Sequence, residues 1–255
     1  MYIQEISIQI KTKADRNEII EEFEFLLGSY RRSGQTQGTI ESQYISDNKI
    51  ICLPYTLEKK SLDKKFDNFY VNNRKKIVEE LCGTKLEIRT VGKSHESYKG
   101  PCSCKKSEFY LLFTNFLSID SPLTCGTCNK SVPLYRIPVY YDHGYLPILS
   151  WQTNYISCDS LQMNSEVGER WALNQMQEPT SQLSRQGLTI CRKIEELTLV
   201  PTFYYLHNYR KAKGDQLARP CPVCKKKWNL KTALHGYYDF KCDRCRLVSV
   251  VSPNV

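Results

Sequence analysis

Cys221-Pro222-Val223-Cys224 and Cys242-Asp243-Arg244-Cys245 are two C-x2-C pairs near the end of the sequence, joined by the segment Lys225–Lys241. The short spacing inside each pair lets two sulfurs reach one ion, and two pairs complete a tetrahedron. This arrangement is typical of a zinc ribbon and predicts a structural Zn2+ held by four thiolates. Four sulfurs leave no open position for water, so we do not expect this ion to be catalytic.

Whether these thiols bind metal or form disulfides depends on the cellular compartment of the protein. Met1–Glu5 carries an acid where a secretory signal needs a base, and no apolar core follows it. No uninterrupted apolar run approaches the roughly 18 residues of a membrane span. We therefore expect a cytoplasmic protein with no membrane partner, in which paired cysteines bind metal more often than they form disulfides. A disulfide ribbon is the alternative.

A second group of cysteines lies upstream, as Cys102-Ser103-Cys104 and Cys125-Gly126-Thr127-Cys128. Between them the run Phe109–Phe113 favours a β-strand. We predict that these four cysteines hold a second structural zinc ion, although the C-x-C half is less usual than C-x2-C. The alternative is four ordinary thiols, some of them buried as small apolar groups. The isolated cysteines are expected to be core residues: Cys52, Cys82, Cys158 and Cys191.

The first part of the chain, residues 1–95, reads as a compact domain of strands and helices. A strand pattern covers Tyr2 to Ile10, and an amphipathic helix follows from a cap at Asp15 to Tyr30. The remaining predicted elements are strands at Thr39–Ile45 and Lys49–Pro54, a helix at Leu62–Leu81 and a strand at Lys85–Val91. The order βαββαβ predicts a ferredoxin-like unit.

The middle segment, residues 96–210, is predicted to be a zinc-braced domain that precedes a ribbon at residues 211–255. Tyrosines and prolines around Tyr135–Pro147 favour irregular structure or short strands. Helices are predicted at Glu166–Gln177, with Val167, Trp171 and Met176 facing inward, and at Ser181–Leu197. An aromatic strand at Pro201–Tyr209 leads into the ribbon. The fold class expected for the whole chain is α+β.

Four segments carry a resemblance to a known family. They are Gly168–Leu173, Leu183–Gly187, Pro201–Leu206 and the Cys221–Cys245 ribbon. With them the chain resembles a bacterial family of zinc-ribbon-containing proteins to which nucleic-acid binding is attributed. The resemblance covers most of the chain and is most specific from Cys102 onward. Some members stand beside genes of antibacterial polymorphic toxins, so the resemblance also implies immunity proteins that neutralise such toxins.

The charge of the ribbon bears on nucleic-acid binding. The formal net charge of the chain is +9, but a zinc centre with four thiolates carries about −2, so two centres lower it to about +5. A few free cations then give only weak, salt-sensitive binding to phosphates. The candidate phosphate contacts are Lys225, Lys226, Lys227, Lys231, Arg244 and Arg246. The candidate stacking residues, which instead pack the ribbon's own core in the alternative interpretation, are Trp228, His235, Tyr237 and Tyr238.

Protein binding is the competing class of function. The chain has 17 tyrosines, many of them in the segments 135–145 and 204–209. Tyrosine is enriched in protein interfaces because it buries a large area and keeps a polar tip. The candidate contact residues are Tyr140, Tyr141 and Tyr145, and the alternative is that most tyrosines lie at the edges of the core.

Catalysis is not expected, because H-E-x-x-H, G-x-S-x-G and Walker motifs are all absent from the sequence. Asp142-His143 resembles part of an HNH-type nuclease site, but no other histidine has the spacing to complete one. We therefore expect a non-catalytic, zinc-stabilised binding protein. The first hypothesis is an immunity protein that binds a cognate toxin directly. The second is an RNA- or DNA-binding protein acting through the ribbon.

Overall fold

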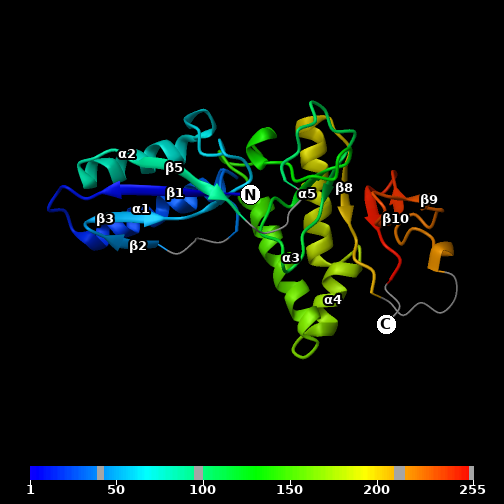
Figure 1. Ribbon diagram of the computed structural model, residues 1–255. Coiled ribbons are helices and arrows are strands. Elements are labelled where there is room, and N and C mark those ends of the chain that lie inside the picture. Colours follow the sequence, from blue (N-terminus) through cyan, green and yellow to red (C-terminus); the bar gives the residue numbers. More distant parts are fainter. Residues whose placement is uncertain (39–42, 95–99, 210–215, 253–255) are drawn as a thin grey trace. The chain divides into compact units, whose positions relative to one another are not determined.

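The computed structural model describes residues 1–38, 43–94, 100–209 and 216–252, and it is a mixed α+β structure of two compact units (Figure 1). The first unit comprises Met1–Cys102, Ile119–Ser121 and Lys130–Leu146. The second comprises Ser103–Ser118, Pro122–Asn129 and Pro147–Val255. In the described ranges, no helix has the length and apolar character needed to cross a membrane.

The first unit contains the predicted strands and helices in the predicted order, with the strand β4 and two short 3-10 helices added. Its elements are β1 (Tyr2–Gln9), α1 (Arg16–Arg32), β2 (Gln43–Ser46), β3 (Lys49–Cys52), β4 (Tyr55–Thr56), the short 3-10 helix η1 (Lys64–Phe66), α2 (Phe69–Cys82), β5 (Glu87–Lys93) and the 3-10 helix η2 (Leu134–Arg136). Residues 39–42 of the predicted strand 39–45 lie outside the described residues. The second helix begins later than predicted, because Asn68 caps it by accepting a hydrogen bond from the Val71 amide.

All strand pairs in the sheet of this unit are antiparallel. β1 is central: it pairs with β3 through Ile6–Gln9 and with β5 through Tyr2–Ser7. These pairings overlap at Ile6 and Ser7, so β3 and β5 lie on opposite edges of β1. β2 pairs with the outer edge of β3, and the two-residue β4 pairs with the start of β1.

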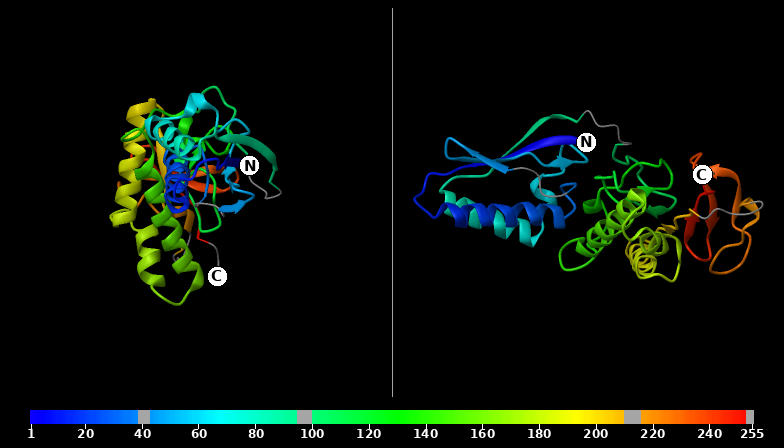
Figure 2. Two further views of the ribbon diagram at one scale, coloured as in Figure 1. Left: turned by 90° about the vertical axis from the view of Figure 1, so that its left-hand side faces the viewer. Right: turned by 90° about the horizontal axis from the view of Figure 1, so that it is seen from below.

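Both helices of the first unit cover one face of its sheet (Figure 2, right). The apolar residues of α1 recur at helical spacing, and Ile19, Phe23 and Tyr30 are completely buried. From β1, Ile6 and Ile8 enter the same core, because alternate residues of a strand face the same side. Burial of this apolar stripe is therefore the main stabilising contribution in the first unit.

Residues 130–146, from the middle of the sequence, belong to the first unit. The hydroxyl of Tyr135 lies 2.7 Å from a carboxylate oxygen of Glu58 and 2.9 Å from the hydroxyl of Ser61. The amide of Tyr145 donates to the carbonyl of Arg32 at 2.8 Å. This segment has the irregular backbone and short turns that its prolines and tyrosines predict.

The second unit contains the remaining elements. They are β6 (Tyr110–Leu112), β7 (Leu123–Cys125), α3 (Leu146–Asn164), α4 (Glu169–Gln177), α5 (Gln182–Thr198), β8 (Thr202–Tyr205), the 3-10 helix η3 (Gln216–Ala218), β9 (Asn229–Leu234), β10 (Tyr238–Cys242) and β11 (Leu247–Ser249). Helix α3 has no counterpart in the sequence prediction. Ser181 caps α5 as predicted, accepting a hydrogen bond from the Ser184 amide.

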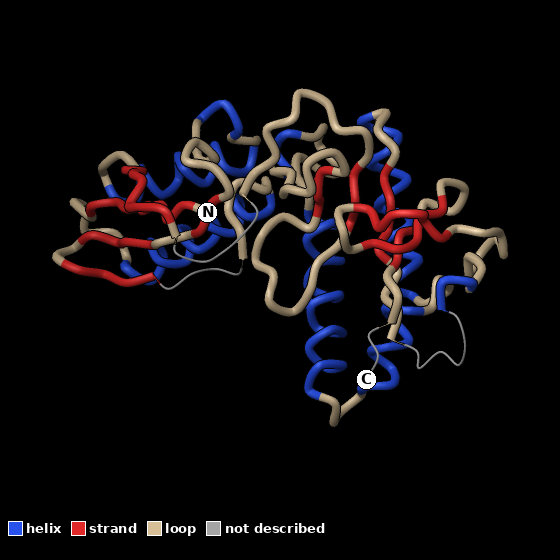
Figure 3. Tube along the Cα trace, turned by 45° about the vertical axis from the view of Figure 1, so that its right-hand side comes forward, coloured by secondary structure: helices blue, strands red, loops and turns tan. Residues whose placement is uncertain are grey.

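One sheet runs through the whole second unit in the order β7-β6-β8-β11-β10-β9 (Figure 3). Its centre is β8, which pairs in parallel with β6 on one side and β11 on the other. All four residues of β8 are buried, as expected for a strand between two others and against a helix. The ribbon strands β9, β10 and β11 therefore continue the sheet of the middle segment.

Helices α3 and α5 pack their buried faces against this sheet. Trp151 of α3 makes an edge contact with the ring of Tyr204 at 6.0 Å between centroids, and Gly187 of α5 lies directly against the same tyrosine. The orientation predicted for α4 is wrong in part. Met176 is buried, but Val167 precedes the helix at 76% exposure and Trp171 is 57% exposed.

Candidate metal centres

The four cysteines of the ribbon come together as their spacing predicts. Their Sγ atoms all lie within 4.8 Å of one another, and Cys224 Sγ is 3.7 Å from Cys242 Sγ. Cys242 is the last residue of β10, and Cys245 lies in the turn before β11. The pairing of β10 with β11, in which Cys242 is opposite Leu247, therefore fixes the turn that carries this C-x2-C pair.

The backbone of the C-x2-C turns explains why they can hold an ion. The residue that follows the second cysteine has a positive φ in each turn: Asn129 at 56°, Lys225 at 59° and Arg246 at 52°. The amide of Lys225 donates to the carbonyl of Cys221, and that of Asn129 to the carbonyl of Cys125, at 2.9 and 2.8 Å. These tight turns direct both sulfurs of a pair to the same side.

The upstream cysteines form a second group of the same kind, since the Sγ atoms of Cys102, Cys104, Cys125 and Cys128 also lie within 4.8 Å of one another. The hydroxyl of Ser107 is 3.1 Å from the sulfur of the buried Cys125. A Cβ at Gly126 would fall 2.4 Å from the Phe109 ring, so only glycine fits in this turn. The C-x-C half is anchored differently, by a 2.7 Å hydrogen bond from the Cys102 amide to the Ser131 carbonyl.

Both groups fit a tetrahedral metal ion. Bonds of about 2.3 Å from zinc to sulfur place two tetrahedral ligands about 3.8 Å apart, which the 3.7 Å separation of Cys224 and Cys242 matches. A disulfide would bring two sulfurs to about 2.05 Å, and none of the twelve cysteines, all of which lie in the described ranges, forms one. The two four-cysteine groups are therefore compatible with two structural metal ions.

The pKa values of the ribbon thiols also favour binding of a metal cation. The pKa of Cys224 is lowered to about 7, chiefly because the Lys226 backbone N–H donates to its sulfur. Burial and the neighbouring thiols raise the pKa of Cys245, and burial raises that of Cys242. Four adjacent thiols resist simultaneous ionisation, and a divalent ion bound among them removes that resistance.

The other four cysteines behave as core residues. All of them are buried: Cys52, Cys82, Cys158 and Cys191. Burial raises the pKa of Cys82 to about 11 and raises those of Cys158 and Cys191. Thiols with raised pKa values are poor nucleophiles and poor metal ligands at neutral pH.

Most of the predicted cationic residues of the ribbon lie on its surface. The exposed ones are Lys225, Lys226, Lys227, Lys231 and Arg244. Arg246 differs, because its guanidinium forms two hydrogen bonds with the carboxylate of Glu195, at 2.9 and 2.7 Å. Arg246 therefore joins the ribbon to α5 and is not free for a phosphate.

The aromatic residues of the ribbon divide between core and surface. Trp228 is 3% exposed, and its indole N–H donates to the Arg219 carbonyl at 3.1 Å. Tyr238 is also buried, whereas Tyr237 is exposed. His235 is exposed as a residue, but its Nε2 atom lies 2.8 Å from the Gly126 carbonyl oxygen. Trp228 and Tyr238 therefore pack the core, and Tyr237 is 53% exposed although its ring contacts that of Tyr238.

The candidate protein-binding tyrosines differ in the same way. Tyr141 is 63% exposed, and Tyr140 is half-buried. Tyr145 is 4% exposed, and its hydroxyl donates to the Ile137 carbonyl at 2.7 Å. Tyr145 therefore packs inside the first unit and presents no surface to a partner.

Asp142 and His143 form the tip of a turn in the first unit, both with positive φ. Asp142 makes an ion pair with Arg32 and accepts a hydrogen bond from Tyr70. The ring of His143 contacts that of Phe69 at 5.9 Å between centroids. In the described part of the chain, metal-ligating side chains cluster only in the two four-cysteine groups.

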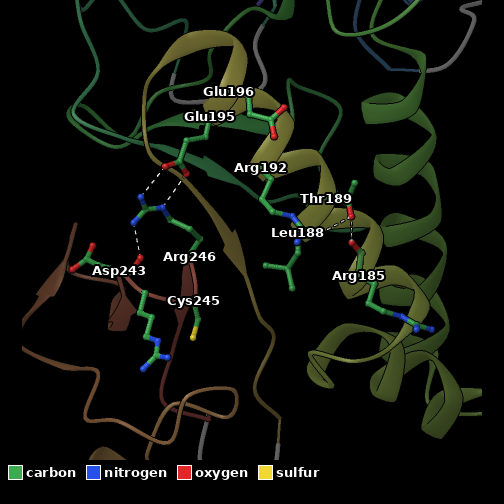
Figure 4. Close-up of a pocket in the computed structure, with 10 residues that line it drawn as sticks. Arg185, Leu188, Thr189, Arg192, Glu195, Glu196, Asp243, Cys245 and Arg246 are labelled. Atoms are coloured by element: carbon green, nitrogen blue, oxygen red, sulfur yellow. Dashed lines mark hydrogen bonds and ion pairs between the residues drawn. The ribbon is translucent and has the colours of Figure 1, made fainter.

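No sequence motif predicts a role for two further arginines near the ribbon, although Arg185 lies in the segment Leu183–Gly187 that carries the family resemblance. Arg185 and Arg192 lie on α5 and, with Arg244, line a pocket beside the second C-x2-C turn (Figure 4). Their i, i+7 spacing places them on one helix face, which is the sequence signal that could have found them.

Three family models match the chain, each described as a domain of unknown function. They cover residues 1–92 (DUF8589), 104–207 (DUF2310) and 210–255 (DUF8594). A protein of Haemophilus influenzae with the name "Uncharacterized protein" is 30% identical over 239 residues, which are 90% of this chain and 89% of that protein. The chain belongs to the family of that protein.

A second relative of the family comes from the same organism and has the same name. It is 37% identical over 145 residues, which cover 56% of this chain and 71% of that protein. No solved structure gives a significant match.

Proposed function

We propose that this protein is a non-catalytic binding protein, that each four-cysteine centre holds a structural zinc ion, and that the ribbon binds nucleic acid. The zinc assignment is supported by two all-thiolate, closed sites whose sulfurs lie within 4.8 Å of one another, a donor set that favours zinc. Cys102, Cys104, Cys125 and Cys128 would hold one ion, and Cys221, Cys224, Cys242 and Cys245 the other. A reducing cytoplasm, which keeps these thiols available, is part of the proposal.

The observation that carries the nucleic-acid assignment is a run of exposed lysines on the ribbon. Lys225, Lys226 and Lys227 follow the first C-x2-C pair and are all exposed. In the described part of the chain, no carboxylate forms an ion pair with any of them. The Lys225 ammonium also donates to the Pro222 carbonyl at 2.9 Å, a neutral partner that leaves its charge uncompensated. Exposed ammonium groups in a row can neutralise successive phosphates, and that interaction supplies most sequence-independent affinity. The exposed ring of Tyr237 supports stacking on a base.

The test is a salt titration of binding to mixed RNA and DNA. Changing Lys225, Lys226 and Lys227 together to Glu should strongly weaken binding at low salt and flatten the salt dependence of the binding that remains. The matched control changes Lys59, Lys60 and Lys64 to Glu, which are exposed residues of the first unit. The control should bind as the wild type does. No binding by the wild type at low salt, or equal loss in both variants, rejects the proposal.

A second candidate function, an immunity protein that neutralises a cognate toxin by direct binding, is favoured by exposed aromatic side chains in the first unit. Phe69 is 62% exposed, and its ring contacts those of Tyr70 and His143 at 5.5 and 5.9 Å. Tyr141 belongs to the same turn as His143. Large exposed rings held in place by neighbours are typical of the centres of protein interfaces.

Co-expression with the product of the neighbouring gene tests this second candidate. That product should arrest growth alone, and this protein should restore growth. Changing Phe69 and Tyr141 to Ala should remove the protection without changing the metal content. A harmless neighbouring product, or killing that this protein does not reduce, rejects an immunity role.

We also propose that the first unit has a ferredoxin-like fold. Its support is the order βαββαβ together with the strand arrangement β2-β3-β1 and β5 on the far edge of β1, all antiparallel. The short β4 is an addition to that plan. The fold narrows the function little, because it supports many unrelated activities.

A further inference from the structure

A pocket lies between α5 and the second C-x2-C turn, both within the second unit. Its volume is about 780 Å3, within the roughly 300–1,000 Å3 of small-molecule sites. The helix and the ribbon turn supply opposite walls, and the side chains of Arg192 and Glu195 extend from the helix (Figure 4). The lining residues are Arg185, Leu188, Thr189, Arg192, Glu195, Glu196, Asp243, Arg244, Cys245 and Arg246.

Each carboxylate that lines the pocket already has a basic partner. The ion pairs are Glu195 with Arg246, Glu196 with Lys193, and Asp243 with Lys241. Lys193 and Lys241 do not line the pocket. The three carboxylates are therefore neutralised either by lysines outside the pocket or by Arg246. The carboxylates therefore do not occupy the remaining guanidinium groups.

Three arginines remain available to a ligand. Arg192 donates to the hydroxyl of Thr189, at 3.1 Å, and both residues are exposed. Arg185 lies farther along α5 with its guanidinium turned away from the ribbon (Figure 4), so it belongs to the rim. In the described ranges, no carboxylate forms an ion pair with Arg185, Arg192 or Arg244. Three such charges exceed the −2 that the ribbon centre, to which Cys245 belongs, would carry with a divalent metal ion bound.

We propose that this pocket binds a phosphate ester through Arg192 and Arg244, with Arg185 at the rim. The planar guanidinium presents paired N–H donors that match two phosphate oxygens, a geometry that lysine lacks. Leu188 offers an apolar contact for the sugar or base of a nucleotide, and Thr189 a hydroxyl. Arg246 is held in place by Glu195 and by the Asp243 carbonyl, which fixes the ribbon wall without competing for the ligand.

The phosphate can come from a free nucleotide or from nucleic acid. The inference goes beyond the proposed function, because none of Lys225, Lys226, Lys227 or Lys231 lines the pocket. A phosphate ester can therefore bind in the pocket even if the ribbon lysines bind no nucleic acid. The two probes that separate the sources are ATP and a short oligonucleotide of mixed sequence.

Calorimetric titration of the metal-loaded full chain with each probe tests the inference. Changing Arg192 and Arg244 together to Ala should weaken binding of at least one probe about tenfold or more, since each removes a charge-assisted pair of hydrogen bonds. Changing both to Lys keeps the charge and the fold, and should recover only part of the affinity. The matched control is Arg170→Ala on α4, which is exposed and does not line this pocket.

Loss of ATP binding identifies a free nucleotide as the source, and loss of oligonucleotide binding alone identifies nucleic acid. The variant with Lys225, Lys226 and Lys227 changed to Glu should still bind ATP, so failure of the lysines does not count against the pocket. The inference is overturned if the wild type binds neither probe, or if the Arg192 and Arg244 variants bind both probes as tightly as the wild type.

Discussion

The Nε2 atom of His235 lies 2.8 Å from the carbonyl oxygen of Gly126. Gly126 stands between the cysteines of the upstream centre, and His235 lies in the turn between β9 and β10 of the ribbon. Nearby, the ammonium of Lys241, next to Cys242, lies 5.4 Å from the centre of the Phe109 ring that packs on Gly126. The two four-cysteine centres are therefore linked directly as well as through their common sheet.

This link predicts that the ribbon slows the loss of metal from the upstream centre. We expect His235→Ala to speed removal of metal from the upstream centre by about fivefold, because one hydrogen bond contributes about 1 kcal/mol. Cadmium NMR of the cadmium-loaded protein gives each centre its own signal, so the decay of each after adding a chelator can be followed. His143→Ala, in the first unit, is the control, and equal decay rates in wild type and His235→Ala would contradict the prediction.

Metal analysis of the purified chain should give two zinc ions. Cys242→Ser should remove one ion and unfold the ribbon strands, because a structural zinc ion supplies folding free energy to its site. Cys104→Ser should likewise leave one ion, whereas Cys52→Ser, at a buried cysteine outside both groups, should leave two. A wild-type content of one would show that the upstream cysteines are ordinary thiols.

The sequence locates both metal groups because the spacing of cysteines along the chain limits where their sulfurs can meet. It does not reveal α3, whose buried face carries polar residues such as Gln152 and Asp159 among aromatic ones. Because buried positions of α3 are polar as well as apolar, the spacing of apolar residues alone does not predict this helix. The ion pair of Arg246 with Glu195 is equally hidden, since its partners are far apart in the sequence and only the fold brings them together.

The contact between Gly187 and Tyr204 predicts that any larger side chain at position 187 overpacks the core of the second unit. A Cβ at Gly187 would fall 2.3 Å from the Tyr204 ring and 3.0 Å from Trp151 Nε1. Gly187→Ala should lower the free energy of unfolding by about 1–3 kcal/mol, because both rings are fully buried and cannot move aside. Gly28→Ala on α1 meets no atom within 4 Å and should stabilise by up to about 1 kcal/mol. Chemical denaturation of both variants compares them, and similar shifts would contradict the packing argument.

His207 predicts a loss of stability in acid. Its ring stacks on Tyr209 at 6.2 Å and has an edge contact with Tyr205, and burial lowers its pKa from 6.5 to about 4. Between pH 6.5 and pH 4, His207 therefore binds a proton in the unfolded chain but not in the folded chain. This stabilisation is complete above pH 6.5 and is lost as the pH falls toward 4, by at most about 3 kcal/mol.

Replacing the histidine isolates its contribution. His207→Phe keeps a ring in the stack but has no titratable group, so its free energy of unfolding should change less between pH 7 and pH 4.5 than that of the wild type. Acid also protonates the metal-binding thiolates, but this affects both proteins equally, so the difference between the two curves belongs to His207. Denaturant titrations at several pH values measure it. Parallel curves would show that His207 takes up its proton in the folded chain as readily as in the unfolded one.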